Sequence, residues 1–350
     1  MPAQFRALIA TVTAPTVFIA ELPITGLQYQ TAINAPATAT VEMPLDAPGA
    51  PTIAAGSTVL WIERNDALVF GGVIWAVAGD AGQNTATVSA GDFLTYLQRR
   101  TIRTTQTFTN ADQLDVARAI VDYANAVPDA LNIIGTAGTN TSGVNISRTF
   151  PSWERKNVGA AIEQLADVNN GFDFVLELTY QGNTPTVELV LTSPNTGNPT
   201  DHVFDLQANI ETLSFTADAT QLATQVDALG SGEGPDKLVA TATQASSAYA
   251  LTQTTIAFSD IAGATLLGTH ADRQLALRRA PITAVSAVIR PDVDPLPGTY
   301  AVGDIVELRA KRGLLDIAGD FRITTLSTAF ANNQERITAT FAEAAAFGTI

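Results

Sequence analysis

The stretch "GSTVLWIERNDALVFGG", residues 56–72, consists of two apolar, alternating segments joined by a charged turn, with glycine at both ends. Near the C-terminus, "GDIVELRAKRGLLDIAG", residues 303–319, has the same length and again begins and ends in glycine. Alternation of apolar and polar residues is typical of half-buried β-strands. We therefore predict that each segment is a pair of strands joined by a turn, and that the two copies reflect a structural duplication.

The two copies are separated by a constant number of positions, since 303 − 56 = 247 and 319 − 72 = 247. The frame aligns three pairs of apolar residues, which are Val59 and Val306, Leu68 and Leu315, and Phe70 and Ile317. We assign four residues as structural repeat glycines, namely Gly56, Gly72, Gly303 and Gly319. The duplication predicts two related β-barrels in one chain.

The composition limits both fold and function. The chain has 350 residues, of which 46% are hydrophobic and 15% charged, so it can form two or more domains with sizeable cores. A net charge of −15 argues against sequence-independent binding of nucleic acid, which needs clustered Lys and Arg. Cysteine is absent and His202 and His270 are far apart in sequence, so we predict no metal site and no cofactor.

Targeting segments are not evident in the sequence. Residues 1–23 lack the basic start and the unbroken apolar core of a signal peptide. No stretch approaches the roughly 20 apolar residues of a membrane span. We expect a protein without a membrane span that is synthesised in the cytoplasm.

The order of strand-like and helix-like segments predicts a mainly β fold with α+β elaborations. We expect a first β-barrel over residues 1–98 and an α+β domain of two helices and a small sheet over 99–205. A second β-barrel is expected from residues 206–235 and 293–350, interrupted by a small inserted α/β subdomain over 236–292.

Three helices are expected in these units. The first, within residues 110–127, has Asn110 as its candidate N-cap and Asp112 in its first turn. The second is expected to end at Gly171 in a left-handed cap. A third, over about 265–279, belongs to the inserted subdomain.

A glycine cluster in "GSGEGPDK" is the clearest flexible break in the sequence. It contains Gly230, Gly232 and Gly234, which we assign as the hinge to the inserted subdomain. The cluster does not match the Gly-x-Ser-x-Gly pattern of a serine nucleophile. No helix is expected directly after it, which argues against a phosphate-binding loop.

Candidate catalytic residues are few. Glu154, Glu163, Asp167 and Asp173 lie within one unit, and a pair of carboxylates could hydrolyse a glycosidic bond. Acidic residues on helix surfaces are usually solvated, however, so we predict no catalytic pair. The two histidines lack a visible catalytic partner and are interpreted as structural.

Aromatic and basic residues offer other candidate binding sites. Trp61, Trp75 and Trp153 could stack on sugars, but the first two are expected in a core or a subunit contact. Trp153 is expected to fasten a helix to the sheet. The basic cluster at 273–279, with Arg290, is interpreted as cations near a helix C-terminus, with docking to an acidic partner as the alternative.

Several segments resemble the hub proteins of phage tail tips and baseplates. "VFGGVIWAV" (69–77) followed by "ATVSAGDFLTYLQRRTI" (86–102) looks like the first barrel of that family and its exit. "LGSGEG" (229–234) resembles the interruption of its second barrel. "HADRQLALRRAPITAVSAVI" (270–289) followed by "PGTYAVGDIVELRA" (297–310) is similar to the closing segment of minor tail proteins of long-tailed phages.

The resemblance implies a structural protein of the virion rather than an enzyme. Family members form a homotrimer whose six barrels make an approximately sixfold ring, which contacts the tail-tube hexamer or the distal tail protein above and a spike or central fibre below. DNA and the tape-measure protein pass through the lumen, and an acidic lumen wall would suit that passage. The alternatives are a carbohydrate-active or receptor-binding tail protein, or the equivalent hub of a contractile injection device.

Overall fold

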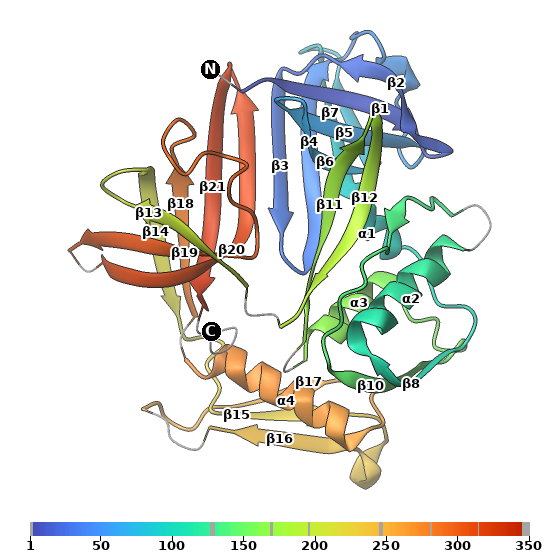
Figure 1. Cartoon of the computed structure of the whole chain (residues 1–350), viewed down its shortest axis with the longest axis vertical. Helices are drawn as coiled ribbons and strands as arrows, with labels where there is room; N and C mark the ends of the chain where they lie inside the picture. The colour runs from blue at the N-terminus through green and yellow to red at the C-terminus, as the bar shows by residue number, and fades with distance from the viewer. Residues whose placement is uncertain are drawn as a thin grey trace.

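The protein, described by a computed structural model, is mainly β, as predicted. The structure describes residues 3–126, 130–168, 171–194, 197–244, 248–280, 282–313 and 315–344. Figure 1 shows β-sheets from both ends of the chain side by side in the upper half, and the helices below and beside them.

The N-terminal part of the chain forms an antiparallel sheet that curves around its own core. Its elements are β1 (Phe5–Thr11), β2 (Ala14–Leu22), β3 (Gly26–Ala32), β4 (Ala35–Pro44), the 3-10 turn η1 (Ala50–Thr52), β5 (Thr58–Arg64), β6 (Ala67–Asp80) and β7 (Thr85–Asp92). The strand order is β3-β4-β7-β6-β5-β1-β2. Alternate residues such as Leu60, Ile62 and Phe70 point into the core, which explains the period-two pattern of the sequence.

The C-terminal part of the chain forms a second curved sheet with a core of its own. Its strands are β13 (Asn198–Asp205), β14 (Ile210–Asp218), β18 (Ile282–Ile289), β19 (Asp304–Arg312), β20 (Leu315–Ala331) and β21 (Gln334–Glu343). The order is β14-β18-β21-β20-β19-β13, with β13 parallel to β19. Phe204, Val306, Phe321 and Phe341 belong to this core. β13 was expected in the α+β domain, but it adds to this sheet.

The two sheets form one continuous sheet, because β20 pairs with strands of both. Its first half pairs with β19, and after an irregularity between Ile323 and Thr325 its second half pairs antiparallel with β3. The β3–β20 ladder runs from the pair Thr325 and Ala32 to the pair Ala331 and Gly26. Residues almost 300 positions apart in the sequence are therefore joined by backbone hydrogen bonds.

A unit of helices and short strands packs against the outside of the first sheet. It contains α1 (Phe93–Leu97), β8 (Gln106–Asp112), α2 (Gln113–Asn125), β9 (Ile134–Gly135), β10 (Asn145–Phe150), α3 (Val158–Ala166), β11 (Asp173–Gln181) and β12 (Thr184–Thr192). Val59 and Trp61 of β5 share a buried cluster with Ile120 of α2 and Ile162 of α3. Strand β5 is thus buried on both faces, and the helical unit shares its core with the first sheet.

Two helix ends differ from the sequence prediction. Helix α2 is capped by Asp112, whose side chain accepts a backbone N–H of the first turn, whereas Asn110 lies in β8. Helix α3 ends at Ala166, so Gly171 is not its cap. Gly171 is needed for a different reason: a Cβ there would lie 2.1 Å from the Ala166 carbonyl oxygen.

The inserted unit lies between β14 and β18. It contains β15 (Gln225–Leu229), η2 (Gly234–Asp236), β16 (Val239–Thr243), β17 (Gln253–Ala257) and α4 (Ala264–Arg278), and α4 lies where a helix was expected. The expected limits, 236–292, differ at both ends, because β15 pairs with β16 and β17, whereas β18 pairs with β14 and β21. Alternation identifies a strand but not its neighbours, which is why the limits were misplaced.

Polar contacts fasten the inserted unit to the helical unit. Asp260, in the loop before α4, accepts hydrogen bonds from Arg148 and Lys156, both at 3.0 Å, and from Gln164 at 3.1 Å. Burial alone would raise the pKa of Asp260, but Lys156, Gln164 and Arg148 together outweigh it, so the pKa is lowered. Figure 1 shows the inserted unit, with α4 and β15 to β17, at the bottom of the molecule, below the helical unit.

Candidate functional surface

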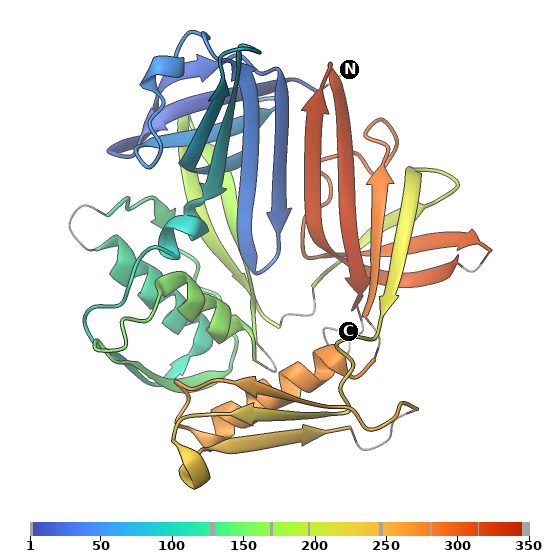
Figure 2. The same ribbon diagram turned by 180° about the vertical axis from the view of Figure 1, so that it is seen from behind.

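Eight strands from both barrels form one continuous antiparallel surface, in the order β6-β7-β4-β3-β20-β21-β18-β14. Figure 2 shows their long segments side by side, with no other element drawn in front of them. We name this surface the shared wall. One of its faces covers the two barrel cores, and the other, which we name the open face, is turned away from them.

The open face is rich in hydroxyl and amide side chains. Residues that alternate with the buried ones and remain at least partly exposed are Gln28, Gln30, Thr38, Thr40, Thr85, Thr87, Ser89, Thr212, Ser214, Thr216, Ser286, Thr325, Ser327, Thr338 and Thr340. Four charged residues follow the same alternation: Glu42, Asp80, Asp218 and Arg336. Their sum, one positive and three negative charges, is −2, whereas the whole chain carries −15.

A buried ion pair lies where the two barrels and the helical unit meet. Arg322 of β20 and Asp173 of β11 are 1% and 5% exposed, and the Arg322 Nη2 donates to the Asp173 carboxylate. Asn34, in the turn between β3 and β4, donates from Nδ2 to Asp173 Oδ1 at 2.8 Å and accepts from the Phe174 N–H at 2.7 Å. One carboxylate therefore joins three parts of the chain.

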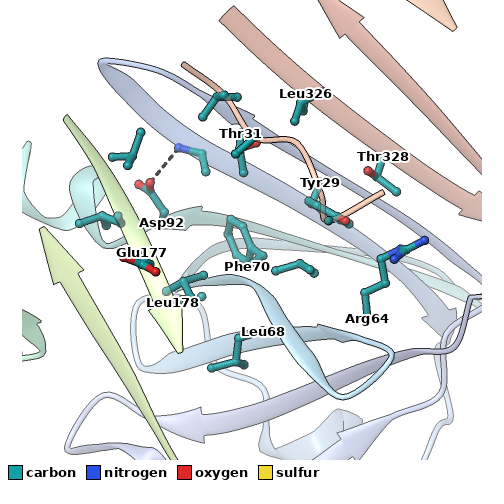
Figure 3. Close-up of a pocket in the computed structure, with 18 of the residues that line it drawn as sticks. Tyr29, Thr31, Arg64, Leu68, Phe70, Asp92, Glu177, Leu178, Leu326 and Thr328 are labelled. Atoms are coloured by element: carbon teal, nitrogen blue, oxygen red, sulfur yellow. Dashed lines mark hydrogen bonds between the residues drawn. The ribbon is translucent and has the colours of Figure 1, made fainter. Parts of the chain in front are cut away.

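A second ion pair crosses between the barrels beside a cavity of about 610 Å³. The Arg64 guanidinium donates to both oxygens of Glu335, at 2.7 and 2.8 Å. Figure 3 shows Phe70 and Leu178 beside this cavity, with Asp92 at its side accepting a hydrogen bond. Burial raises the pKa of Asp92 to about 7 despite three backbone N–H donors.

The first glycines of the two copies have the same backbone role. Gly56 and Gly303 both adopt positive φ, +79° and +95°, which favours glycine. The Gly56 N–H donates to the carbonyl of Ile74 in β6 at 2.7 Å, and the Gly303 N–H donates to the carbonyl of Ile323 in β20 at 2.8 Å. Each of these isoleucines directly precedes an irregularity in the pairing of its strand.

Residues of β5 and β19 that are 247 positions apart do not occupy equivalent places in the two barrels. Val59 belongs to the cluster shared with the helices, whereas Val306 belongs to the second barrel core. Leu60 is the residue of β5 that points into the first barrel core, as Val306 does in the second. The pairing of β5 begins one residue later than that of β19, with Ser57 as the extra residue, and a slip of one residue exchanges the faces of a strand.

The second glycines have different surroundings. A Cβ at Gly72 would lie 2.1 Å from the Gly91 carbonyl oxygen, whereas Gly319 has open space around it. Only Gly72 is required by a close approach of two backbones. The role of the four glycines as marks of a repeat stays a prediction.

The glycine cluster lies inside the inserted unit, between β15 and β16. Gly230 donates its N–H to the Leu238 carbonyl at 2.7 Å, and Gly232 and Gly234 have φ of +102° and +56°. A hinge here would open the inserted unit itself rather than its joint to the barrel.

Three of the four candidate carboxylates are held by hydrogen bonds from other side chains. Asp173 is bound to Arg322, Glu163 accepts from Gln98 Nε2 at 2.9 Å, and Asp167 accepts from Gln274 Nε2 at 2.7 Å. Glu154 is half-buried and lies in the connection between β10 and α3.

The two histidines lie in separate units. His270 of α4 is 1% exposed and packs on Phe258 with ring centres 4.5 Å apart. Burial, helped by Arg148, lowers the pKa of His270 to about 4. His202 Nε2 lies 2.7 Å from the Thr299 carbonyl oxygen. Both have structural contacts, as interpreted from the sequence.

The three tryptophans have different environments. Trp61 is fully buried and donates from Nε1 to the Pro15 carbonyl at 2.8 Å, and half-buried Trp75 lies beneath Arg99, whose Cζ is 4.0 Å from the ring centre. The prediction that Trp153 fastens a helix is wrong, since this side chain is 77% exposed.

The basic cluster at the end of α4 is divided between inside and outside. Arg273 is 9% exposed, with Nε 4.0 Å from Asp167, whereas Arg278 donates to the Gln274 carbonyl in the last helical turn. Arg290 lies beyond β18 and donates its backbone N–H to Asn209. The cations do not form one docking patch.

Sequence reasoning missed the open face and the Arg322–Asp173–Asn34 contact. The open face had a signal, because "GLQYQTA" (26–32) and "RITATFA" (336–342) alternate apolar residues with uncharged polar ones. The Arg322–Asp173–Asn34 contact had none, since Asn34 and Arg322 are 139 and 149 positions away from Asp173.

Two absences concern the described residues only. In these ranges no helix is long and apolar enough to cross a membrane. Nor do the same parts of the chain contain a group of three or more histidine or acidic side chains placed to hold a metal ion.

No protein family profile and no curated protein matches this sequence. Solved structures match nearly the whole chain. The tail protein from Neisseria meningitidis is 12% identical, with a TM-score of 0.61 and coverage of 97% of this chain and 96% of its own. The 43 kDa tail protein of prophage MuSo2 from Shewanella oneidensis is 10% identical, with a TM-score of 0.67 and coverage of 99% and 100%.

A third match is a component of the type VI secretion system of E. coli that exhibits structural similarity to T4 bacteriophage tail proteins. It is 9% identical, with a TM-score of 0.56, and the alignment covers 97% of this chain and 78% of the other. At these identities the matches show a shared fold. The structural neighbours of this chain are thus phage tail proteins and a related secretion component.

Proposed function

We propose that this chain is a structural hub of a phage tail tip, built from two related barrels, a helical α+β domain and an inserted unit. The observation that carries the proposal is the shared wall: two barrels joined edge to edge by β3 and β20 into one sheet. Structural neighbours from phage tails, matched along nearly the whole chain, support it.

The hub is a homotrimer in which three chains, with two barrels each, make a ring of six. A ring of six similar barrels presents an approximately sixfold face to the tail-tube hexamer or distal tail protein, and three chains present a threefold face to a spike or central fibre. The barrel contact inside the chain supports this arrangement, because it provides one of the two contact types that such a ring needs.

The open face lines the channel through which DNA and the tape-measure protein pass. The open face consists mainly of uncharged hydroxyl and amide side chains, and the cation named on it is Arg336. Phosphate binding depends on clustered Lys and Arg. The lining differs from the acidic wall suggested by the net charge, since the face carries only −2. A nearly neutral polar wall offers DNA neither attraction nor a strong repulsive barrier.

The hub of a contractile injection device is the second candidate, favoured by the E. coli secretion component among the neighbours. Both candidates share the ring and differ in the machine around it. Imaging of the assembled particle separates them by the presence or absence of a contractile sheath.

Mass measurement of the purified chain, followed by imaging of the particle, tests the proposal. We expect a trimer in solution and a ring at the tail tip, in contact with a hexameric ring above. A stable monomer that binds or cleaves glycans, and that is absent from the tail tip, would overturn the hub function in favour of a carbohydrate-active or receptor-binding protein.

A further inference from the structure

Strands β6 and β20 have the same two-part layout. In β20, the residues before the irregularity at Thr324 pair with β19 and those after it pair with β3. In β6, the residues before the irregularity at Trp75 pair with β5. Beyond it, Ala76–Asp80 pair with β7 on one edge, and no strand of the described chain pairs with the other edge. The edge of β6 that corresponds to the β3 contact is open.

The shared wall has a second open edge at its opposite end. β14 pairs with β18 alone, so its outer edge has no partner strand among the described residues. Figure 2 shows β14, in yellow, at one end of the wall, and the β6–β7 pair, in teal, at the other. In topology β14 corresponds to β3, because each is the outer neighbour of a strand that pairs with the last strand of its barrel's meander.

The register of the missing contact follows from two lateral rows of paired residues. In the first barrel the row passes through Ala76, Ser89, Thr40 and Gln28. In the second barrel the corresponding row passes through Thr325, Thr340, Ser286 and Ser214. Both rows begin at the residue after the irregularity.

At the β3–β20 ladder inside the chain, the row of the first barrel meets β20 four residues beyond the start of the row of the second barrel. Gln28, at the end of the first row, pairs with Ala329, which is 329 − 325 = 4 positions beyond Thr325. The same advance places Ser214 of one copy opposite the residue four positions beyond Ala76, which is Asp80. Thr216 then lies opposite Ala78.

Exposed apolar side chains fit this register. Phe215 is 40% exposed and Val77 is 44% exposed, although both lie in strands. The register sets Phe215 opposite Gly79, above which lies the side chain of Leu45, itself 38% exposed, so that Phe215 would pack on Leu45. Pairing would cover three exposed apolar residues together, which is favourable by the area removed from water. The carboxylates of Asp80 and Asp218 lie at opposite ends of the ladder and do not face each other.

We propose that copies of this chain join by antiparallel pairing of β14 of one copy with Ala76–Asp80 of the next, with Thr216 opposite Ala78. The occupant of each open edge is therefore a second copy of this chain. The inference rests on the proposed hub function and repeats the β3–β20 ladder between chains. Because each contact uses two different edges, it is heterologous, and it closes into a ring after three copies.

Engineered cysteines test the register, since the natural chain contains none. The variant Thr216→Cys with Ala78→Cys places the two cysteines directly opposite each other in neighbouring copies, within the Cβ separation that a disulfide needs. On mild oxidation we expect most of the chain to move from the monomer band into covalent dimers and trimers on a non-reducing gel. Reduction returns it to the monomer band.

Two matched variants serve as controls. Gln30→Cys with Ser327→Cys is the equivalent pair inside one chain, and it is expected to oxidise within the monomer without forming larger bands. Thr216→Cys with Asp80→Cys is displaced by two residues, where the separation of about 7–8 Å is too long for a disulfide. We expect its covalent trimer to be at least about tenfold weaker than that of the in-register pair.

The outcomes separate this inference from the proposed function. A trimer by mass that gives no interchain disulfide with Thr216→Cys and Ala78→Cys overturns the edge contact but leaves the hub standing. Equal cross-linking of the displaced pair overturns the register. A chain that stays monomeric and is absent from the tail tip overturns both.

Discussion

Removal of the Arg322 guanidinium tests how the barrels and the helical unit are held together. In Arg322→Met, the Asp173 carboxylate, 5% exposed, loses the guanidinium that binds it and keeps the hydrogen bond from the Asn34 amide. Breaking a buried ion pair by removing one partner costs about 3–5 kcal/mol, because a charge is left buried without compensation. We expect a loss of this size in the free energy of unfolding, and a large shift of the urea midpoint, measured by circular dichroism.

A surface pair in the same hairpin of β19 and β20 provides the control. Lys311 and Asp316 are 3.0 Å apart, with side chains 79% and 65% exposed. Such pairs contribute about 1 kcal/mol or less, so Lys311→Met should change stability very little. Adding Asp173→Asn to Arg322→Met removes the stranded charge and should recover part of the loss, with a coupling energy of about 0.5–3 kcal/mol.

The reasoning fails if Arg322→Met and Lys311→Met have the same small effect. It also fails if the double variant is destabilised by the sum of the two single effects. Additivity would mean that the two side chains act independently, which is incompatible with one buried contact.

Three further predictions concern single residues. Gly72→Ala should lose more than about 2 kcal/mol in urea unfolding, because its Cβ would lie 2.1 Å from the Gly91 carbonyl oxygen, while Gly319→Ala should stay within about 1 kcal/mol; equal effects would contradict this. The Asp92 pKa, raised by burial from its ordinary 3.8 to about 7, gives stability that is complete below about pH 4 and is lost as the pH rises through 7. Asp92→Asn, uncharged throughout, should therefore lose less stability than the natural chain between about pH 4 and pH 8, and parallel pH profiles would refute the assignment. Trp153→Ala should change the free energy of unfolding by less than about 0.5 kcal/mol, since the ring is 77% exposed. A larger loss of stability would reveal that the ring has a packing role.

The sequence was informative where a pattern is local. Alternation predicted the mainly β fold and the strands of both glycine-bounded segments. Helix α4 also lies where a helix was expected, at about 265–279. The helix caps were less predictable, because Asn110 and Asp112 are both good caps by residue type and only the pairing of β8 with β10 decides between them.

Prediction failed where a single residue changes the frame or where contacts are remote. The pairing of β5 begins one residue later after its glycine than that of β19, and this shift turns Val59 and Val306 to opposite faces. The β3–β20 ladder joins residues almost 300 positions apart, and no alternation within either strand specifies the other. For the same reason β15 was expected in the second barrel, and residues 198–205, which form β13, were placed in the α+β domain.

The charges along the outer strands bear on whether the open edges are meant for partners. Unpaired strand edges invite aggregation, and proteins usually protect them with charge or proline. β13, an outer strand of the second barrel, follows this rule, with Pro199 and Asp201 on it. By contrast, residues 212–217 of β14 and 76–79 of β6 contain neither a charged residue nor proline, and the charges of the proposed ladder, Asp80 and Asp218, lie at its two ends. The interior of the proposed ladder therefore lacks the charge and proline that usually block strand pairing, which agrees with a strand of a second copy as its occupant.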